Sequence, residues 1–142
     1  MNKKVLILSI KPQYVEQIFN GNKTIELRKS MPSVKVGDTI IVYSTVPVKA
    51  IVGTCKISDI IEESPENIWL EHSKKLGISD EAFWKYYKNS SKSIGIGLSE
   101  ICKFDLHIPL SEIKKIHPSF HPPQCFKYVS KMTALKSFLQ LS

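Results

Sequence analysis

Runs of β-branched and other apolar residues lie towards both ends of this 142-residue chain, and one block of helical pattern separates them. Such short apolar or alternating runs are typical of strands. They do not alternate regularly with helices, so a doubly wound parallel sheet is disfavoured. The order favours an α+β fold, a small, mainly antiparallel β-barrel with peripheral helices, in which Gly53 marks a bulge or a barrel corner. We expect strands at residues 5–10, 23–29, 39–43, 48–61 and 93–104, with residues 106–109 continuing or pairing with the last of them.

The helical block lies between about residues 64 and 89 and contains two helix starts. Ser64 is followed by a proline and a glutamate, which is a favourable beginning for a helix. Gly77 predicts the end of that helix, and Ser79 predicts the start of the second. Aromatic residues recur at helical spacing in the second helix, which more often marks a core than a base-stacking surface. We therefore expect a two-helix insert within one domain that spans residues 1–142, and further helices at residues 12–20 and 133–141.

Arg28 is the only arginine among the 20 basic residues of the chain. Its guanidinium group is planar and permanently charged, and it offers a rigid fork of donors that the ammonium group of lysine lacks. Such a fork suits a carboxylate, a phosphate or the edge of a base. The plainer interpretation is that Glu26 and Arg28 pair with each other, or with a neighbouring strand, on a wet face, where an ion pair contributes little.

The residues before Arg28 indicate a change from helix to strand. Gly21 ends an amphipathic helix, and the apolar period then becomes two. In that register Thr24, Glu26 and Arg28 share one face of a strand, opposite to Lys23. We expect Lys23, Glu26 and Arg28 to line one concave site.

Charge is distributed unevenly along the chain, which has a formal net charge of +7. One acidic segment, residues 59–81, interrupts an otherwise basic molecule. A basic face opposite an acidic helical insert fits a protein that binds a polyanion. The alternative is that the lysines serve only to keep the protein in solution.

Three cysteines, Cys55, Cys102 and Cys125, are widely spaced and form no CxxC pair. We expect them to be reduced and mostly buried. The apolar run near the N-terminus is too short for a signal-peptide core, and no stretch approaches the length of a membrane span. These features predict a cytoplasmic protein with no membrane partner.

His117, His121 and Cys125 recur at four-residue spacing, which on a helix would suggest metal ligands. The prolines between them forbid that helix and predict an ordered loop over residues 117–124. Zinc normally takes four ligands, and no fourth stands nearby. The sequence therefore predicts no metal site and no cofactor, and it defines no oligomeric state.

Several short motifs together resemble a known family. They are Ser-Ile-Lys-Pro at residues 9–12, Gly-x-Lys-x-x-Glu-x-Arg at residues 21–28, a Gly-Asp turn at residues 37–38 and Pro-Pro-Gln-x-Phe at residues 122–126. Over nearly the whole chain, their order resembles the ASCH domain of the PUA-like superfamily. The resemblance implies a PUA-like β-barrel and a role in recognising RNA or a nucleotide, which can be a modified one. A regulatory role is one form that such recognition takes.

One branch of ASCH-like proteins is similar to an amidohydrolase that acts on acylated cytidine. Its motif, Lys-Thr-x-Thr-x-Arg, supplies a lysine base and a threonine nucleophile. Lys23 and Thr24 match the first two positions, but Glu26 stands where the nucleophile belongs. A further catalytic glutamate of that branch has only Glu62 and Glu63 as candidates here.

Three functions remain open at this point. The first is a module that binds RNA, single-stranded nucleic acid, or a nucleotide or nucleoside. The second is a small hydrolase, on a nucleoside amide or on RNA, that uses Lys23, Glu26 and Thr24. The third is a protein-interaction domain that uses the acidic helices. The expected ligand-binding residues are Ser9, Lys11, Lys23, Glu26, Arg28, Tyr43, Ser44 and Phe126, with Tyr128 as an alternative to Phe126.

Overall fold

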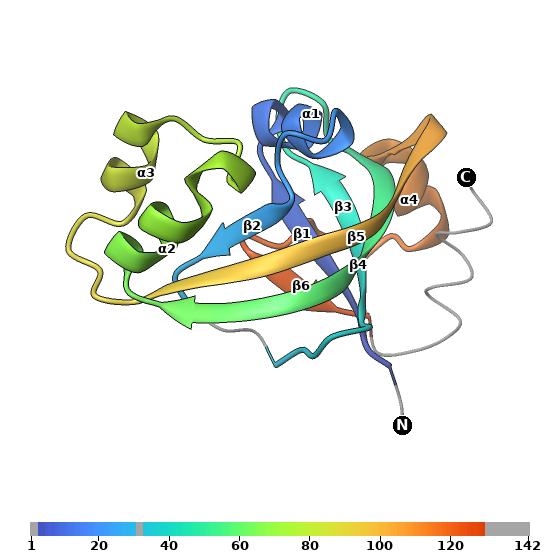
Figure 1. Cartoon of the computed structure of the whole chain (residues 1–142). Helices are drawn as coiled ribbons and strands as arrows, with labels where there is room; N and C mark the ends of the chain where they lie inside the picture. Colours follow the sequence, from blue (N-terminus) through green and yellow to red (C-terminus); the bar gives the residue numbers. More distant parts are fainter. Residues whose placement is uncertain (1–2, 31–32, 130–142) are drawn as a thin grey trace.

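One curled sheet of six strands dominates the molecule, and helices lie at its ends and over its faces (Figure 1). The computed structural model describes residues 3–30 and 33–129. The strand order is β2-β5-β4-β3-β1-β6, and every neighbouring pair is antiparallel except the parallel pair β1 and β3. The α+β, mainly antiparallel prediction is therefore confirmed, with the sheet forming a half-barrel. The strands are β1 Val5–Ile10, β2 Ile25–Arg28, β3 Thr39–Ser44, β4 Ala50–Glu63, β5 Ser93–Pro109 and β6 Phe126–Tyr128.

The curl is concentrated in the two longest strands, β4 and β5. Their pairing register shifts three times, once between Ile51 and Gly53. A Cβ atom at Gly53 would lie 2.4 Å from the carbonyl oxygen of Cys102, so the close approach of these strands requires glycine there. The predicted irregularity at Gly53 is confirmed. Residues 106–109, left open above, continue β5.

Both faces of the central strands are buried. Leu6 and Leu8 of β1 pack in one cluster with residues of α1 (Pro12–Phe19), whereas Ile7 packs in a second cluster with residues of α4 (Leu110–Ile116). Alternate residues of a strand point to opposite faces. The continuous apolar character of β1 thus reflects a strand that is covered on both sides.

The interval between β4 and β5 holds α2 (Pro65–His72), a 3-10 turn at Ser73–Lys75, and α3 (Asp80–Tyr86). We call this interval the helical insert. The hydroxyl oxygens of Ser64 and Ser79 accept hydrogen bonds from backbone N–H groups in the first turns of α2 and α3, as their positions predicted. The insert packs on β2 through a third cluster formed by Ile25, Leu27, Ile68, Leu76, Phe83 and Tyr87.

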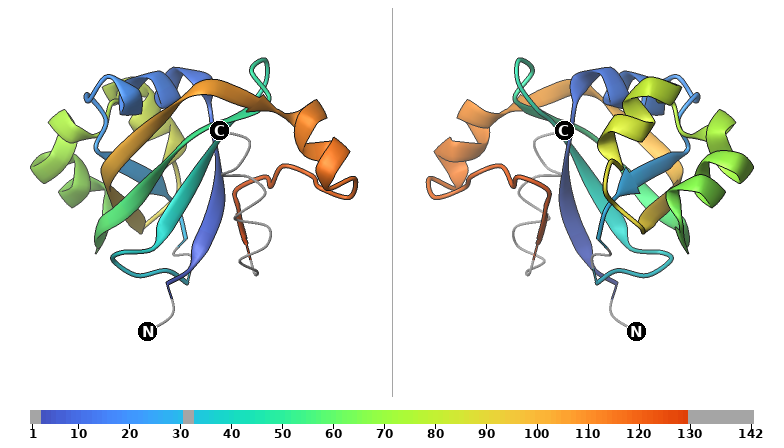
Figure 2. Two further views of the ribbon diagram at one scale, coloured as in Figure 1. Left: turned by 90° about the vertical axis from the view of Figure 1, so that its right-hand side faces the viewer. Right: turned by 90° about the vertical axis from the view of Figure 1, so that its left-hand side faces the viewer.

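The C-terminal part departs from expectation. Neither α4 nor the short strand β6 was predicted, and the loop between them runs as expected without regular structure. Figure 2 shows α4 and the helical insert at opposite ends of the sheet. The helix expected at residues 133–141 lies outside the described residues.

The cysteines correct another expectation. Cys55 is buried, but Cys102 and Cys125 are exposed, so the prediction of mostly buried thiols is wrong. Cys102 lies on an exposed part of β5, and Cys125 lies in the loop directly before β6. Neither position is covered by the core. Within residues 3–30 and 33–129, no helix is long and apolar enough to cross a membrane.

Candidate functional site

Glu26 lies between two cations in the interior of the protein. Its Oε2 atom is 2.9 Å from Nη2 of Arg28, and its Oε1 atom is 3.7 Å from Nζ of Lys23. The exposed fractions of the three side chains are only 3% for Lys23, 8% for Glu26 and 12% for Arg28. The three residues form a buried charged cluster. The plainer interpretation is right that Arg28 pairs with Glu26 and wrong that the pair lies on a wet face.

Lys23 reaches this cluster because it precedes the strand. It forms an isolated antiparallel bridge with Leu76 of the insert, and β2 begins only at residue 25. The alternating register of a strand therefore does not apply to it, and the prediction that Lys23 faces away from Glu26 is wrong. Thr24, the next residue, is exposed and lies apart from the cluster.

The ammonium group of Lys23 also connects the sheet to the insert. It donates a hydrogen bond of 2.7 Å to the carbonyl oxygen of Leu76, and it lies 5.4 Å from the ring centroid of Tyr14. Burial lowers the pKa of Lys23, and the negative charge of Glu26 opposes part of this shift. The group is thus nearer to losing its proton than an exposed lysine is.

Arg28 uses its donors within the protein. Besides Glu26, Nη2 donates to the carbonyl oxygen of Ser9 at 3.2 Å, and Nη1 donates weakly to that of Cys125 at 3.5 Å. Its Nε atom is buried and has no hydrogen-bond partner among the described residues. The fork therefore joins β2 to the end of β1 and to the segment before β6, which lie far apart in the sequence.

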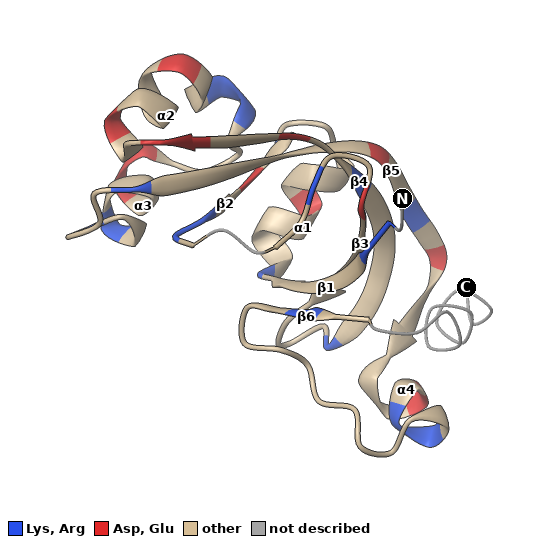
Figure 3. Ribbon diagram, turned by 90° about the horizontal axis from the view of Figure 1, so that it is seen from below, with Lys and Arg blue, Asp and Glu red and all other residues tan. Residues whose placement is uncertain are grey.

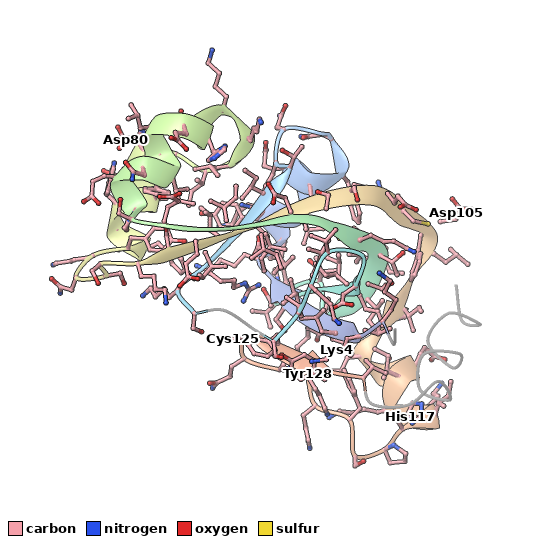
Figure 4. The ribbon with its side chains drawn as sticks, turned by 60° about the horizontal axis from the view of Figure 1, so that its bottom comes forward. Lys4, Asp80, Asp105, His117, Cys125 and Tyr128 are labelled. Carbon is pink, nitrogen blue, oxygen red and sulfur yellow. The ribbon has the colours of Figure 1, made fainter. Side chains whose placement is uncertain are left out.

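A cleft of about 710 Å³ opens over the charged cluster. Its walls come from α1, the ends of β1 and β2, α3 and the segment before β6, and Figure 4 shows Cys125 of that segment beside the sheet. A volume of this size is typical of small-molecule and cofactor sites. The lining residues are Ser9, Ile10, Lys11, Gln13, Tyr14, Lys23, Glu26, Leu27, Arg28, Thr45, Ile78, Ala82, Lys85, Tyr86, Gln124 and Cys125.

The cleft carries an excess of positive charge. Glu26 is the only acidic residue in its lining, against four basic ones. Lys11 and Lys85 are exposed and form no ion pair within the part of the chain that the structure describes. In Figure 3 basic segments mark the C-terminal ends of β2 and α3, whereas acidic segments lie on α2 and the adjoining end of β4. Such a cleft attracts an anion.

The structure brings together some of the expected site residues and not others. Ser9, Lys11, Lys23, Glu26 and Arg28 line the cleft. Tyr43 is buried in the cluster under α4, Ser44 is buried beside it, and Phe126 packs against the main core, so none of these three is part of the lining.

Tyr14, Tyr86, Gln124 and Cys125 line the cleft although sequence reasoning did not select them for it. The proline-rich motif ending at Phe126 is the one signal that pointed to Gln124 and Cys125. Tyr86 belongs to the aromatic run for which a base-stacking surface is the less favoured alternative to a core, and no sequence signal marks Tyr14. Among the described residues no group of three histidine, cysteine or acidic side chains is placed to hold a metal ion.

The half-barrel, the helical insert and the charged cluster define a recognised class of small domain. The ASCH domain model matches residues 8–106, and the chain belongs to the ASCH domain family. It therefore has a fold of the PUA-like superfamily, as the motifs indicated.

Individual relatives extend the likeness over the whole chain. An ASCH domain-containing ribonuclease of Zymomonas mobilis is 24% identical over 135 residues, which is 92% of this chain and 87% of that protein. The crystal structure of ASCH from Zymomonas mobilis matches with a TM-score of 0.92 at 23% identity, covering 99% of this chain and 96% of that one. Human THYN1, solved in complex with DNA that contains 5-methylcytosine, matches with a TM-score of 0.61 at 12% identity over 98% and 97% of the two chains.

Proposed function

We propose that the cleft binds RNA, or a single-stranded nucleic acid or nucleotide of similar chemistry. The observation that carries the proposal is that two exposed lysines, Lys11 and Lys85, line a cleft that opens over a buried charged cluster. Neither lysine forms an ion pair among the described residues. Unpaired cations at a rim neutralise phosphates, while a concave floor receives a base.

Six residues of the lining have a role in this proposal. Lys11 and Lys85 contact phosphate, and the ring of Tyr14 offers a surface on which a base stacks. Each carboxylate oxygen of Glu26 has one cationic partner and retains a lone pair, so Glu26 accepts a hydrogen bond from an exocyclic amino group. Arg28 and Ser9 hold the wall of the cleft, because their donors are directed at backbone carbonyl groups.

Two relatives support the chemical class of ligand. One is named as a ribonuclease, and the other was solved with methylated DNA. The proposal includes a cytoplasmic location, which three free cysteines support, since thiols persist where the environment is reducing.

Fluorescence anisotropy with a labelled, 2′-O-methylated RNA octamer tests the proposal, because this strand resists attack by its own 2′ oxygen. The double variant Lys11→Gln, Lys85→Gln should weaken binding by about tenfold or more, as two phosphate contacts are lost. The matched control is Lys56→Gln, Lys114→Gln, which removes two exposed lysines from outside the cleft. Equal loss in both double variants would show that binding follows net charge and not the cleft.

A second candidate function is cleavage of RNA in the same cleft. The observation that favours it is the buried Lys23, whose pKa burial lowers, next to Glu26. A lysine with a lowered pKa accepts a proton from a ribose 2′-hydroxyl group as a general base. Thr24 lies outside the lining, so Lys23 and Glu26 carry this chemistry.

Incubation of unmodified RNA with the wild type and with Lys23→Met separates cleavage from binding. If Lys23 is the base, the variant should bind the 2′-O-methylated octamer with nearly wild-type affinity and release no fragments from unmodified RNA. Thermal melting of both proteins verifies that the variant folds. Fragments released at the wild-type rate by folded Lys23→Met would exclude this role.

A further inference from the structure

We propose that Tyr86 forms a second stacking subsite, so that the preferred ligand is a single strand of at least two nucleotides and not a free mononucleotide. This inference rests on the function proposed above. It restricts the ligand to a strand of at least two nucleotides. The charged cluster and Tyr14 alone do not make this restriction, because together they could hold a single base.

Tyr86 differs from its neighbours on α3. Phe83 and Tyr87 of the same helical segment have exposed fractions of 0% and 3%, and they form the core beneath the insert. Tyr86 packs against Tyr87 with ring centroids 4.8 Å apart but remains 37% exposed, and it lines the cleft. One side of the ring thus packs against a buried aromatic neighbour, while part of the residue stays exposed in the lining of the cleft.

One lysine lies next to the exposed ring, and a second lysine precedes Tyr86 in the chain. Nζ of Lys29 lies 4.9 Å from the ring centroid of Tyr86, and Lys85 precedes Tyr86 on the same helix. Both lysines are exposed, and neither forms an ion pair with the residues that the structure describes. A phosphate that joins two nucleotides near this ring would therefore meet positive charge next to it.

The contact between Lys29 and Tyr86 does not block the ring. An exposed cation–π contact is weaker than the stacking of a base on an aromatic side chain. An incoming base therefore displaces the ammonium group, which then contacts the adjoining phosphate. The hydroxyl group of Tyr86 is neutral at neutral pH, since its ordinary pKa is 10.0 and burial raises that pKa further, so it adds no negative charge against the strand.

Tyr14 and Tyr86 belong to different elements that line the same cleft, α1 and α3. A base on Tyr14 and the next base on Tyr86 would place the linking phosphate along the rim that carries the unpaired lysines. A mononucleotide can occupy only one of these subsites at a time.

Titration with 2′-O-methylated RNA strands of one, two, four and eight nucleotides tests the inference. We expect the wild type to bind the dinucleotide about tenfold or more tightly than the mononucleotide, which is the contribution of one stacked base. Tyr86→Leu should remove this step and leave the affinity for the mononucleotide unchanged. Tyr86→Phe keeps the ring and should keep the step.

Tyr128→Leu is the matched control. Tyr128 is also 37% exposed and also lies near a lysine, with Nζ of Lys4 at 5.4 Å from its ring centroid, but it lies outside the cleft lining (Figure 4). Its replacement should leave the step between one and two nucleotides intact. Equal affinity of the wild type for one and two nucleotides, or equal weakening of both by Tyr86→Leu, would overturn the inference while the proposed function stands. Failure of every strand to bind would overturn both.

Discussion

At the scale of single residues, the role of Arg28 differs from that of a free phosphate-binding arginine. Its two terminal nitrogens contact Glu26 and the carbonyl oxygens of Ser9 and Cys125, so the fork joins three segments of the chain. The residue type matters because the guanidinium group holds several donors in a rigid planar fork, whereas lysine ends in a single nitrogen atom. Arg28 therefore shapes the cleft by holding its wall and contributes to folding through the same contacts.

Replacement of Arg28 by lysine should consequently lower stability. The variant keeps the charge beside Glu26 but loses backbone contacts, and we expect the free energy of unfolding to fall by about 2 kcal/mol. Urea denaturation of the wild type and of Arg28→Lys measures the change. Lys29→Arg, at the exposed neighbouring position, serves as the control and should leave stability within about 0.5 kcal/mol. An unchanged midpoint in Arg28→Lys would contradict this account.

The charge state of Lys23 predicts a dependence on pH. Burial lowers its pKa below the ordinary value of 10.5, so between the two pKa values the folded protein binds fewer protons than the unfolded chain. The contribution of Lys23 to the free energy of unfolding therefore rises with pH in that window and falls as the pH drops through the folded-state pKa.

Comparison with Lys23→Met isolates this contribution, since the other titrating groups are common to both proteins. The wild type should gain stability relative to Lys23→Met as the pH rises from the lowered folded-state pKa of Lys23 towards the ordinary value of 10.5. Denaturant unfolding at several pH values measures the difference. A difference that stays constant across the range would mean that Lys23 keeps its ordinary pKa in the folded protein.

At the scale of elements, the contact between the helical insert and the strand β2 positions the cleft. Gly77 follows the 3-10 turn with φ of +57°, and a Cβ atom there would lie 2.5 Å from Cβ of Lys23. Two restrictions therefore act on this position, a left-handed backbone and a close approach to the charged cluster.

Gly77→Ala tests whether the insert depends on that approach, and Gly21→Ala supplies the matched control. Gly21 has φ of +89°, but a Cβ atom at that position would meet nothing within 4 Å. We expect Gly21→Ala to cost about 1 kcal/mol from backbone strain alone, and Gly77→Ala to cost at least about 2 kcal/mol. Equal losses of unfolding free energy would show that the contact with Lys23 relaxes freely.

The elements also show how far the sequence predicts this fold. The approximate positions of β1 to β5, the serine caps of α2 and α3, and the irregularity at Gly53 follow from local chemistry and are confirmed, although β2 begins two residues later than expected. Helix α4 and strand β6 were missed because they are short and depend on distant partners, β6 pairing only with β1. Short elements gain most of their stability from tertiary packing, which local pattern does not record.

The site was predictable to a similar extent. The spacing of Lys23, Glu26 and Arg28 marked the charged cluster, but the alternating period put Lys23 on the wrong face. The backbone partners of Arg28 and the cleft position of Tyr86 depend on segments that are distant in sequence. No local rule distinguishes an aromatic side chain at the edge of a core from one inside it.

At the scale of the whole molecule, acidic segments lie on α2 and the adjoining end of β4 (Figure 3), whereas the lining of the cleft carries more basic than acidic residues. The formal net charge of +7 would attract a polyanion from all sides, whereas Lys11 and Lys85, which form no ion pair among the described residues, would direct it to the cleft. An anionic strand should therefore approach the cleft away from α2.

The salt dependence of binding measures how many phosphates the rim contacts. For a single strand, the logarithm of the association constant falls with the logarithm of salt concentration with a slope of about −0.7 per phosphate. Lys11→Gln should make that slope shallower by about 0.7, and Lys114→Gln, at an exposed position outside the cleft, should leave it unchanged. A slope that responds equally to both changes would indicate diffuse attraction.

The two exposed cysteines give the molecule a natural pair of reporter positions. Cys125 lies in the cleft lining and Cys102 lies on β5 outside it, while burial raises the pKa of Cys55 to about 12 and keeps that thiol unreactive. A ligand in the cleft would therefore slow the reaction of Cys125 with a thiol reagent and leave the reaction of Cys102 unchanged. The modification rates of the two cysteines in the native chain would then report occupancy of the cleft, with Cys102 as the internal reference.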